Sequence, residues 1–171
     1  EITGALREGD VAIDLGANVG EITELLAANG ATVHAFEPEP DTFAILSQRF
    51  KGRENVILHN AAVSNFDGKT NLILPESFKE IPRSASKSAS IAYDRYKNDI
   101  VPEVAVKVVD FSRFLSELDR RVRVIKVDIE GAEWDILRGL HDNENFDCFD
   151  LMFVETHERF DLSILPFVKQ Q

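Results

Sequence analysis

The stretch Val11-Ala-Ile-Asp-Leu-Gly-Ala-Asn-Val-Gly20 joins an apolar run to a turn that carries two glycines. The run predicts a buried strand, and residues 21–29 behind the turn have helical apolar spacing that ends at an Asn-Gly pair. Strand, glycine turn and helix in this order are typical of an α/β unit whose turn holds a ligand. Gly16 and Gly20 would allow the backbone to approach that ligand closely.

The alternation of strand and helix continues along the chain. We predict helices at Asp41–Phe50, with Asp41 as N-cap, and at Phe111–Leu118 and Ala132–Leu140. Further strands are predicted at Ala31–Phe36, Val56–His59, Val104–Val109, Val122–Val127 and Leu151–Glu155. This rhythm favours a parallel sheet with helices on both faces.

Two segments interrupt the rhythm. Asp67-Gly68 lies between two short apolar runs, 61–64 and 70–74, and predicts a hairpin. Residues 75–102 are rich in Ser, Lys and Tyr, and we predict one domain over residues 1–171 with a lid-like insertion at about 75–103. Its candidate contacts to a bound molecule are Tyr93, Arg95 and Tyr96. The alternative is an ordinary surface excursion.

Composition limits the class of partner. Lys and Arg total 19 against 30 Asp and Glu, a net charge of −11, which disfavours nucleic acid as a partner. Cys148 is the single cysteine, so no intrachain disulfide can form and a reducing, cytoplasmic location is expected. No apolar run reaches the length of a membrane span. Because the chain begins without Met and ends without a clear stop, we expect a fragment.

Polar side chains lie near or directly after the ends of the main strands: Asp14, Glu37, Asn60, Asp128 and Glu155. Ligands of parallel sheets bind at this carboxyl edge. A dinucleotide fingerprint would place glycines at 16, 18 and 21, but Asn18 and Glu21 stand at the last two positions. Glu21 would repel a diphosphate at the helix N-terminus, which argues against a nicotinamide or flavin dinucleotide and against a reductase.

An adenosine ligand without phosphates avoids this repulsion. Asp14 and Asn18 could meet an ammonium and a carboxylate, and Glu37 follows Asp14 by 37 − 14 = 23 residues. That spacing is close to the one at which an acid after the second strand binds ribose hydroxyls.

At these residues the chain resembles class I S-adenosylmethionine-dependent methyltransferases. The segments Asn60-Ala-Ala-Val-Ser64, Ile125-Lys-Val-Asp-Ile-Glu-Gly-Ala-Glu133 and Val154-Glu-Thr-His157 narrow the resemblance to the FkbM family, over about Val11 to His157. The resemblance implies a Rossmann-like three-layer α/β sandwich with a mostly parallel sheet, and S-adenosylmethionine as cofactor. It also implies O-methylation of a small-molecule or saccharide acceptor. By the resemblance, the donor contacts are Asp14, Gly16, Asn18, Gly20, Glu37, Asn60 and Ala61.

The class usually ends its sheet with two further strands, and only 14 residues follow His157. Either these strands are missing from this chain or the sheet is shortened.

For catalysis we predict Asp128, His157 and Lys126. Asp128 or His157 would take the proton of an alcohol acceptor, and buried Lys126 would need an acid or a carbonyl as partner. A metal site at Asp128, Glu155 and His157 is the less favoured alternative, because no close pair of ligands appears in the sequence. The alternative of another class is a non-catalytic adenosine-ligand-binding or partner module that has kept only the donor site.

Overall fold

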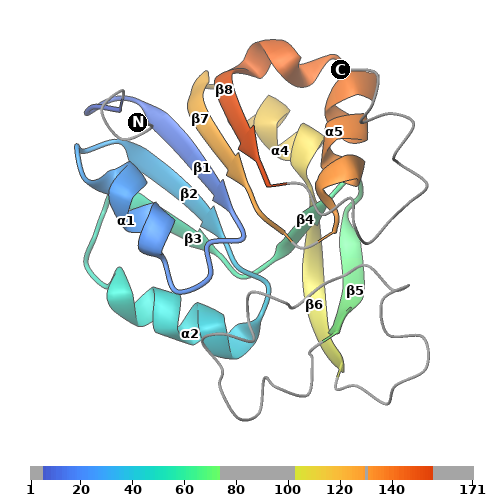
Figure 1. The fold of residues 1–171 in the computed structure, drawn as a ribbon, viewed down its shortest axis with the longest axis horizontal. Helices are drawn as coiled ribbons and strands as arrows, with labels where there is room; N and C mark the ends of the chain where they lie inside the picture. Colours follow the sequence, from blue (N-terminus) through green and yellow to red (C-terminus); the bar gives the residue numbers. More distant parts are fainter. Residues whose placement is uncertain (1–5, 74–102, 130, 156–171) are drawn as a thin grey trace.

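The computed structural model describes residues 6–73, 103–129 and 131–155 (Figure 1). Its helices are α1 (Glu21–Ala27), α2 (Pro40–Arg49), α4 (Phe111–Glu117) and α5 (Glu133–Asp142), with a 3-10 turn η5 at Asn145–Cys148. Its strands are β1 (Val11–Leu15), β2 (Thr32–Phe36), β3 (Val56–His59), β4 (Ala62–Ser64), β5 (Gly68–Ile73), β6 (Glu103–Asp110), β7 (Val122–Val127) and β8 (Phe149–Val154).

Five of these strands form one parallel sheet in the order β3-β2-β1-β7-β8. The chain builds β1, β2 and β3 outward in one direction and then returns to place β7 on the other side of β1. The strand order therefore reverses between β1 and β7, and the crevice beyond their carboxyl ends is where such a sheet binds ligands.

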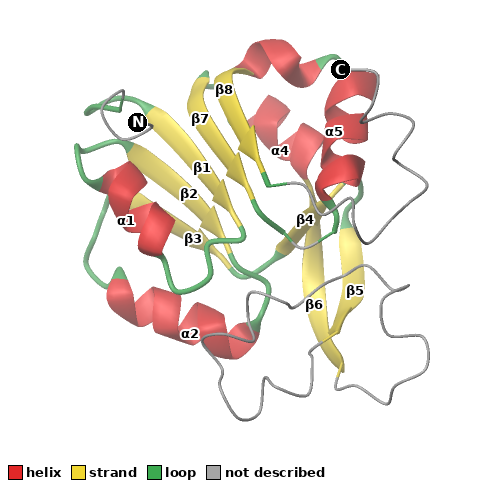
Figure 2. Ribbon diagram, in the orientation of Figure 1, coloured by secondary structure: helices red, strands yellow, loops and turns green. Residues whose placement is uncertain are grey.

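Helices cover both faces of this sheet (Figure 2). On one face, α1 packs Leu26 and Ala27 against the alternate residues of β1, β2 and β7, and α2 adds Leu46. On the other face, α4 and α5 bury Phe111 and Ile136 against Ile13 and its neighbours. The predicted three-layer α/β sandwich with a mostly parallel sheet is confirmed.

A second, three-stranded sheet has the order β4-β6-β5. The predicted hairpin at Asp67-Gly68 is wrong, because β6 lies between β4 and β5, parallel to the first and antiparallel to the second. The Asp67 carboxylate is held at the end of β6, where it accepts hydrogen bonds from the Asp110 amide at 3.2 Å and from Arg113 Nε at 2.6 Å. Asp67 thus joins the turn to the start of α4 and does not close a hairpin.

The start of α2 also differs from the prediction. The N-cap is Glu39, whose carboxylate accepts from the amides of Asp41 and Thr42 at 3.1 and 2.6 Å, and Pro40 occupies the first turn. Proline suits the first helical position because its missing N–H has no helical partner there. Asp41 is therefore inside the helix.

Some predicted features lie outside the described residues. These are the insertion up to residue 102 with Tyr93, Arg95 and Tyr96, the acid Glu130, and His157 with the C-terminal segment. Residue 103, the last of the predicted insertion, begins β6. Among the described helices, none is long and apolar enough to cross a membrane.

Two histidines pair on the α4 face of the sheet. His34 Nδ1 and His59 Nε2 are 3.1 Å apart, so one ring donates a hydrogen bond to the other. His59 also stacks on Phe36 with ring centroids 4.2 Å apart, and Phe114 of α4 contacts both rings edge-on. Burial, followed by the charges of His34 and Lys107, lowers the pKa of His59 to about 4. Burial, followed by Arg120, lowers the pKa of His34 as well.

These lowered pKa values predict a stability that falls in acid. The unfolded chain takes up protons near the ordinary histidine pKa of 6.5, whereas the fold keeps the rings neutral. Stability is therefore fully present above that pH and is lost as the pH falls toward 4. His59→Phe keeps an aromatic ring against Phe36 but cannot titrate. Between about pH 7 and pH 4.5, wild-type protein should lose roughly 1–2 kcal/mol more unfolding free energy than the variant, after allowance for partial exposure.

Urea unfolding at a series of pH values measures this difference. His141→Phe is the matched control, because the His141 side chain is 81% exposed and lies at the end of α5. Identical pH dependence in wild-type protein and His59→Phe would contradict the account of the buried pair.

Candidate functional site at the β1–β7 crevice

The turn between β1 and α1 is held against the end of β2. The amides of Gly16 and Ala17 both donate to the Phe36 carbonyl, at 3.1 and 2.9 Å. Three turn residues have positive φ: Gly16 at 77°, Asn18 at 52° and Gly20 at 86°. Asn18 is a residue type that tolerates this region, and its side-chain oxygen accepts from the Val19 amide at 2.7 Å. The spacing of glycine and asparagine seen in the sequence is thus a backbone requirement of the turn.

Gly16 marks the closest approach between the two sides of the crevice. A Cβ atom at this position would lie 1.9 Å from the Asp128 carbonyl oxygen. The Asp128 amide donates to the Leu15 carbonyl at 3.1 Å, so the β1–β7 pairing continues into the residue that follows β7. Only glycine fits between these backbones.

Gly20 meets α2 on the other side of the turn. A Cβ atom there would lie 2.4 Å from the Phe50 ring and 2.7 Å from Leu46. Arg49 of α2 donates to the Val19 carbonyl at 3.0 Å. The turn is therefore fixed by β2, by the residue that follows β7 and by α2 at once.

Glu37, directly after β2, contacts this turn through its carboxylate. One oxygen accepts from the Asn18 amide at 2.9 Å and the other from the Glu39 amide at 2.9 Å. Only 7% of the residue is exposed. Burial raises the pKa of Glu37 to about 7, although the two amides and Lys126 oppose the shift and the charge of Glu39 adds to it. A carboxylate has about four acceptor sites, so two remain for hydroxyl donors.

Asn60, after β3, lies beside Glu37. Its side-chain amide donates to the carbonyls of Glu37 and Pro38 at 2.9 and 3.2 Å. Asn60 itself is exposed, whereas Ala61 is buried at 3% exposure. These hydrogen bonds join the segments that follow β2 and β3.

Asp14 lies beneath the turn and has no exposed surface. Its Oδ2 accepts from the Thr23 hydroxyl of α1 at 2.6 Å. Its Oδ1 accepts no hydrogen bond within the described part of the chain, but the Lys126 ammonium lies 3.2 Å away. In the structure Asp14 therefore holds the turn from inside, and contact between Asp14 and a ligand stays a prediction.

Lys126 reaches from β7 to the other side of the crevice. Its Nζ donates to the Gly16 carbonyl at 2.8 Å and lies 3.5 Å from Asp128 Oδ2. The sequence predicted that this lysine would find an acid or a carbonyl as partner. The structure provides both.

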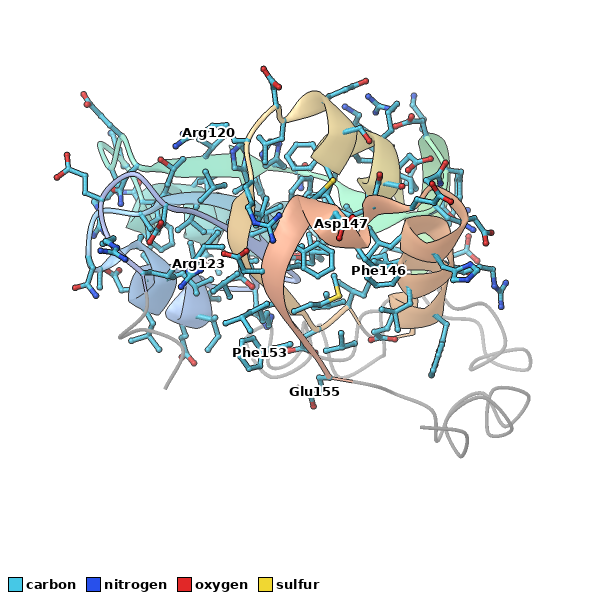
Figure 3. The ribbon with its side chains drawn as sticks, turned by 90° about the horizontal axis from the view of Figure 1, so that it is seen from above. Arg120, Arg123, Phe146, Asp147, Phe153 and Glu155 are labelled. Atoms are coloured by element: carbon cyan, nitrogen blue, oxygen red, sulfur yellow. The ribbon has the colours of Figure 1, made fainter. Side chains whose placement is uncertain are left out.

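Side chains at the ends of β7 and β8 are more exposed. The Asp128 side chain is 35% exposed, and Glu155 lies exposed at the carboxyl end of β8 (Figure 3). The Glu155 amide donates to the Val127 carbonyl at 2.9 Å, which holds it next to the end of β7. The structure does not describe His157, so its place beside Asp128 stays a prediction. No group of three or more His, Cys, Asp or Glu that could hold a metal occurs among the residues it describes.

Three supporting residues were missed from the sequence. In the sequence, Thr23 and Arg49 resemble ordinary helix residues, and Glu133 resembles an acid of a first helical turn. Glu133 is 1% exposed, and its carboxylate accepts a hydrogen bond from the Gly131 amide at 3.0 Å. The position of Thr23, nine residues after Asp14, was the one available signal. A hydroxyl on the buried face of α1 requires a partner.

The contact at Gly16 gives a test with a matched control. Gly16 and Gly52 have nearly the same φ, 77° and 80°, but a Cβ at Gly52 meets nothing within 4 Å. Gly52→Ala should cost about 1–2 kcal/mol of backbone strain. Gly16→Ala adds the collision with Asp128 and should cost about 2 kcal/mol more than the control, or more.

Urea unfolding of both variants measures the difference. Equal losses of stability would mean that the β1–α1 turn and the residue after β7 are not in contact.

Comparison with known proteins agrees with this geometry. A family model for the methyltransferase FkbM domain matches residues 14–169. The chain is 31% identical over 161 residues to "Methyltransferase 1" of Beauveria bassiana, covering 84% of this chain and 63% of that protein. It is 29% identical over 160 residues to "31-O-demethyl-FK506 methyltransferase FkbM" of Streptomyces tacrolimicus, with coverages of 80% and 62%.

A third relative is the "Hexuronic acid methyltransferase AglP" of Haloferax volcanii, 26% identical over 157 residues, with coverages of 91% and 59%. The chain thus spans about three-fifths of the length of these curated relatives. Among solved structures, an rRNA methylase from Streptococcus thermophilus matches with a TM-score of 0.51 and 12% sequence identity. The match covers 99% of this chain and 75% of the methylase chain. That likeness concerns the fold alone. Because the family model matches residues 14–169, the chain belongs to the FkbM methyltransferase domain family.

Proposed function

We propose that this protein is an S-adenosylmethionine-dependent methyltransferase that methylates a hydroxyl oxygen of a small molecule or sugar. The observation that carries the proposal is the Glu37 carboxylate, buried at the end of β2 and bonded to the Asn18 amide of the β1–α1 turn. A carboxylate in this place suits the hydroxyls of a ribose. Glu21, in the first turn of α1, opposes the phosphates of a dinucleotide. The FkbM family membership supports the same class of reaction.

The residues around the crevice fit such a donor. The turn at Gly16–Gly20 has positive φ at Gly16, Asn18 and Gly20, and Glu37 and Asn60 lie side by side after β2 and β3. Glu37 would hold the ribose, Asn60 and Ala61 the adenine, and the turn with Asn18 the amino-acid end. When bound, S-adenosylmethionine supplies an electrophilic methyl group on a positively charged sulfur.

On the acceptor side, the protein would contribute alignment and one proton acceptor. Transfer forms an oxygen–carbon bond as the sulfur–carbon bond breaks, and the acceptor hydroxyl loses its proton. The part-exposed Asp128 carboxylate lies at the end of β7, next to the turn, and is the group placed to receive that proton. Most of the rate enhancement would come from holding the acceptor oxygen in line with the methyl group in a site that excludes water.

The nature of the acceptor is supported by relatives and by charge. Two relatives carry names that specify an FK506 derivative and a hexuronic acid as the molecules they methylate. The net charge of −11 opposes binding to a nucleic-acid backbone. A small organic or saccharide hydroxyl is therefore the acceptor that we propose, although one relative over 66 residues is an rRNA methyltransferase.

Glu37→Gln tests the donor site. A glutamine keeps the shape but replaces one carboxylate oxygen by an NH₂ group, which cannot accept from a ribose hydroxyl or a backbone amide. Calorimetric affinity for S-adenosylhomocysteine should fall by about 10- to 100-fold. Because the pKa of Glu37 is raised to about 7, its carboxyl group ionises as the pH rises through that value. The affinity of the wild-type protein for S-adenosylhomocysteine should therefore rise over this range, and the variant should lack the rise.

Glu54→Gln is the control, because it removes the same charge from an exposed residue in the α2–β3 turn. If Glu37→Gln binds S-adenosylhomocysteine as tightly as the control does, Glu37 is not the ribose ligand.

Asp128→Asn tests the chemistry. The variant should keep its fold and most of its affinity for the donor, because the amide retains the shape of the carboxylate. Methyl transfer to a verified acceptor should fall by roughly 10²- to 10⁴-fold, the usual range for a general base. Transfer of a radiolabelled methyl group measures this, and a chelator should leave wild-type activity intact.

Asp119→Asn is the matched control, since Asp119 is exposed and its φ of 48° is one that asparagine also adopts. Full turnover by Asp128→Asn would show that alignment alone drives the reaction. Loss of wild-type activity with the chelator and its return with a divalent ion would favour the metal alternative.

A further inference from the structure

A buried carboxylate with an incomplete set of partners lies under the β1–α1 turn. Asp14 has no exposed surface, and only its Oδ2 accepts a hydrogen bond, from Thr23. Its Oδ1 accepts none within the described residues and has Lys126 Nζ at 3.2 Å. An isolated buried charge is strongly unfavourable, and the Lys126 ammonium is the opposite charge that lies beside the Asp14 carboxylate.

The protons of that ammonium are already directed at protein groups. Lys126 Nζ contacts the carbonyl oxygens of Gly16 at 2.8 Å and Leu15 at 3.4 Å, and carboxylate oxygens of Asp14 at 3.2 Å and Asp128 at 3.5 Å. An ammonium has three N–H donors. Lys126 hydrogen-bonds to the two backbone carbonyls and forms ion pairs with the two carboxylates. The Lys126 side chain is only 16% exposed, so its ammonium faces protein groups rather than solvent.

These contacts join the two sides of the crevice. Leu15, Gly16 and Asp14 belong to β1 and the turn proposed to hold the methyl donor, whereas Asp128 belongs to the β7 end proposed to hold the acceptor. One ammonium at the point where strand order reverses thus fixes a carbonyl of the donor turn and the carboxylate of the proton acceptor relative to each other.

We infer that Lys126 is a positioning residue: its ammonium compensates buried Asp14 and at the same time orients the Gly16 carbonyl and the Asp128 carboxylate. This replaces the catalytic role expected from the sequence. The assignment of the β1–α1 turn to the methyl donor and of the β7 end to the acceptor rests on the proposed function. Lys126 acts through Asp14, Gly16 and Asp128 and moves no proton itself.

The test separates charge compensation from positioning. The variants are Lys126→Met, Asp14→Asn and the double variant, with Lys107→Met as control because Lys107 is an exposed lysine on β6. Each is measured by urea unfolding and by calorimetric affinity for S-adenosylhomocysteine. Since Asp14→Asn removes the charge that needs compensation, the double variant remains measurable even if Lys126→Met fails to fold.

In the wild-type background, Lys126→Met should lower the urea midpoint clearly more than Lys107→Met does, because it leaves the Asp14 charge buried alone. In the Asp14→Asn background, the same substitution should change the midpoint little. The affinity for S-adenosylhomocysteine should nevertheless change in the Asp14→Asn background. The double variant should bind it at least about tenfold more weakly than Asp14→Asn, because the Gly16 carbonyl loses its hydrogen bond from Lys126.

Each result against this pattern has a distinct meaning. If Lys126→Met is no more destabilising than Lys107→Met, the pairing with Asp14 is refuted. If the double variant binds as tightly as Asp14→Asn, Lys126 only compensates a charge, and the positioning role is refuted. Wild-type protein that binds no S-adenosylhomocysteine would refute the proposed function and the positioning role with it, while the unfolding measurements would still decide whether Lys126 pairs with Asp14.

Discussion

The architecture depends on one close approach of two backbones, at Gly16 and Asp128. The turn after β1 and the residue after β7 are so near that a Cβ atom on Gly16 would reach the Asp128 carbonyl. Because β1 and β7 are neighbours in the sheet but far apart in the chain, this contact fixes the crevice where the strand order reverses. The positive φ at Gly16 and Gly20, the buried Asp14 and the reach of Lys126 are all arranged around it.

Buried charge organises the polar part of the crevice. Three buried acids lie in β1 or follow β2: Asp14 has no exposed surface, Glu39 is 2% exposed and Glu37 is 7% exposed. Each is used differently. Asp14 is compensated by Lys126, Glu39 caps α2, and Glu37 is bonded by two backbone amides while burial holds its pKa near 7. A carboxylate held in this way is rigid before any ligand arrives, which reduces the entropy that binding must overcome.

Much of this could be predicted from local sequence patterns. Apolar runs located β1, β2, β3 and β7, and the polar residues that follow β2, β3 and β7 identified the carboxyl edge of the sheet, where Asn60 contacts Glu37. The resemblance to the FkbM family then predicted S-adenosylmethionine as the methyl donor. These features depend on residues close in the chain, where period and turn chemistry act.

The rest depends on contacts between distant residues. The placement of β6 between β4 and β5 requires pairing of Gly68 with Val108, which turn residues at Asp67 cannot reveal. The His34–His59 hydrogen bond follows from the register of two parallel strands, and the full burial of Asp14 from the packing of α1 over β1. The sequence predicts that Asp14 meets the ammonium of a ligand; the structure shows Asp14 beneath the turn, bonded to Thr23 of α1.

The central claim is that the crevice binds a phosphate-free adenosine donor. Native mass spectrometry of the purified protein, incubated with equal amounts of S-adenosylhomocysteine and NAD, tests it most directly. The account predicts a complex with the mass of one S-adenosylhomocysteine and no complex with NAD. A complex with NAD, or protein that remains free of both, would contradict it.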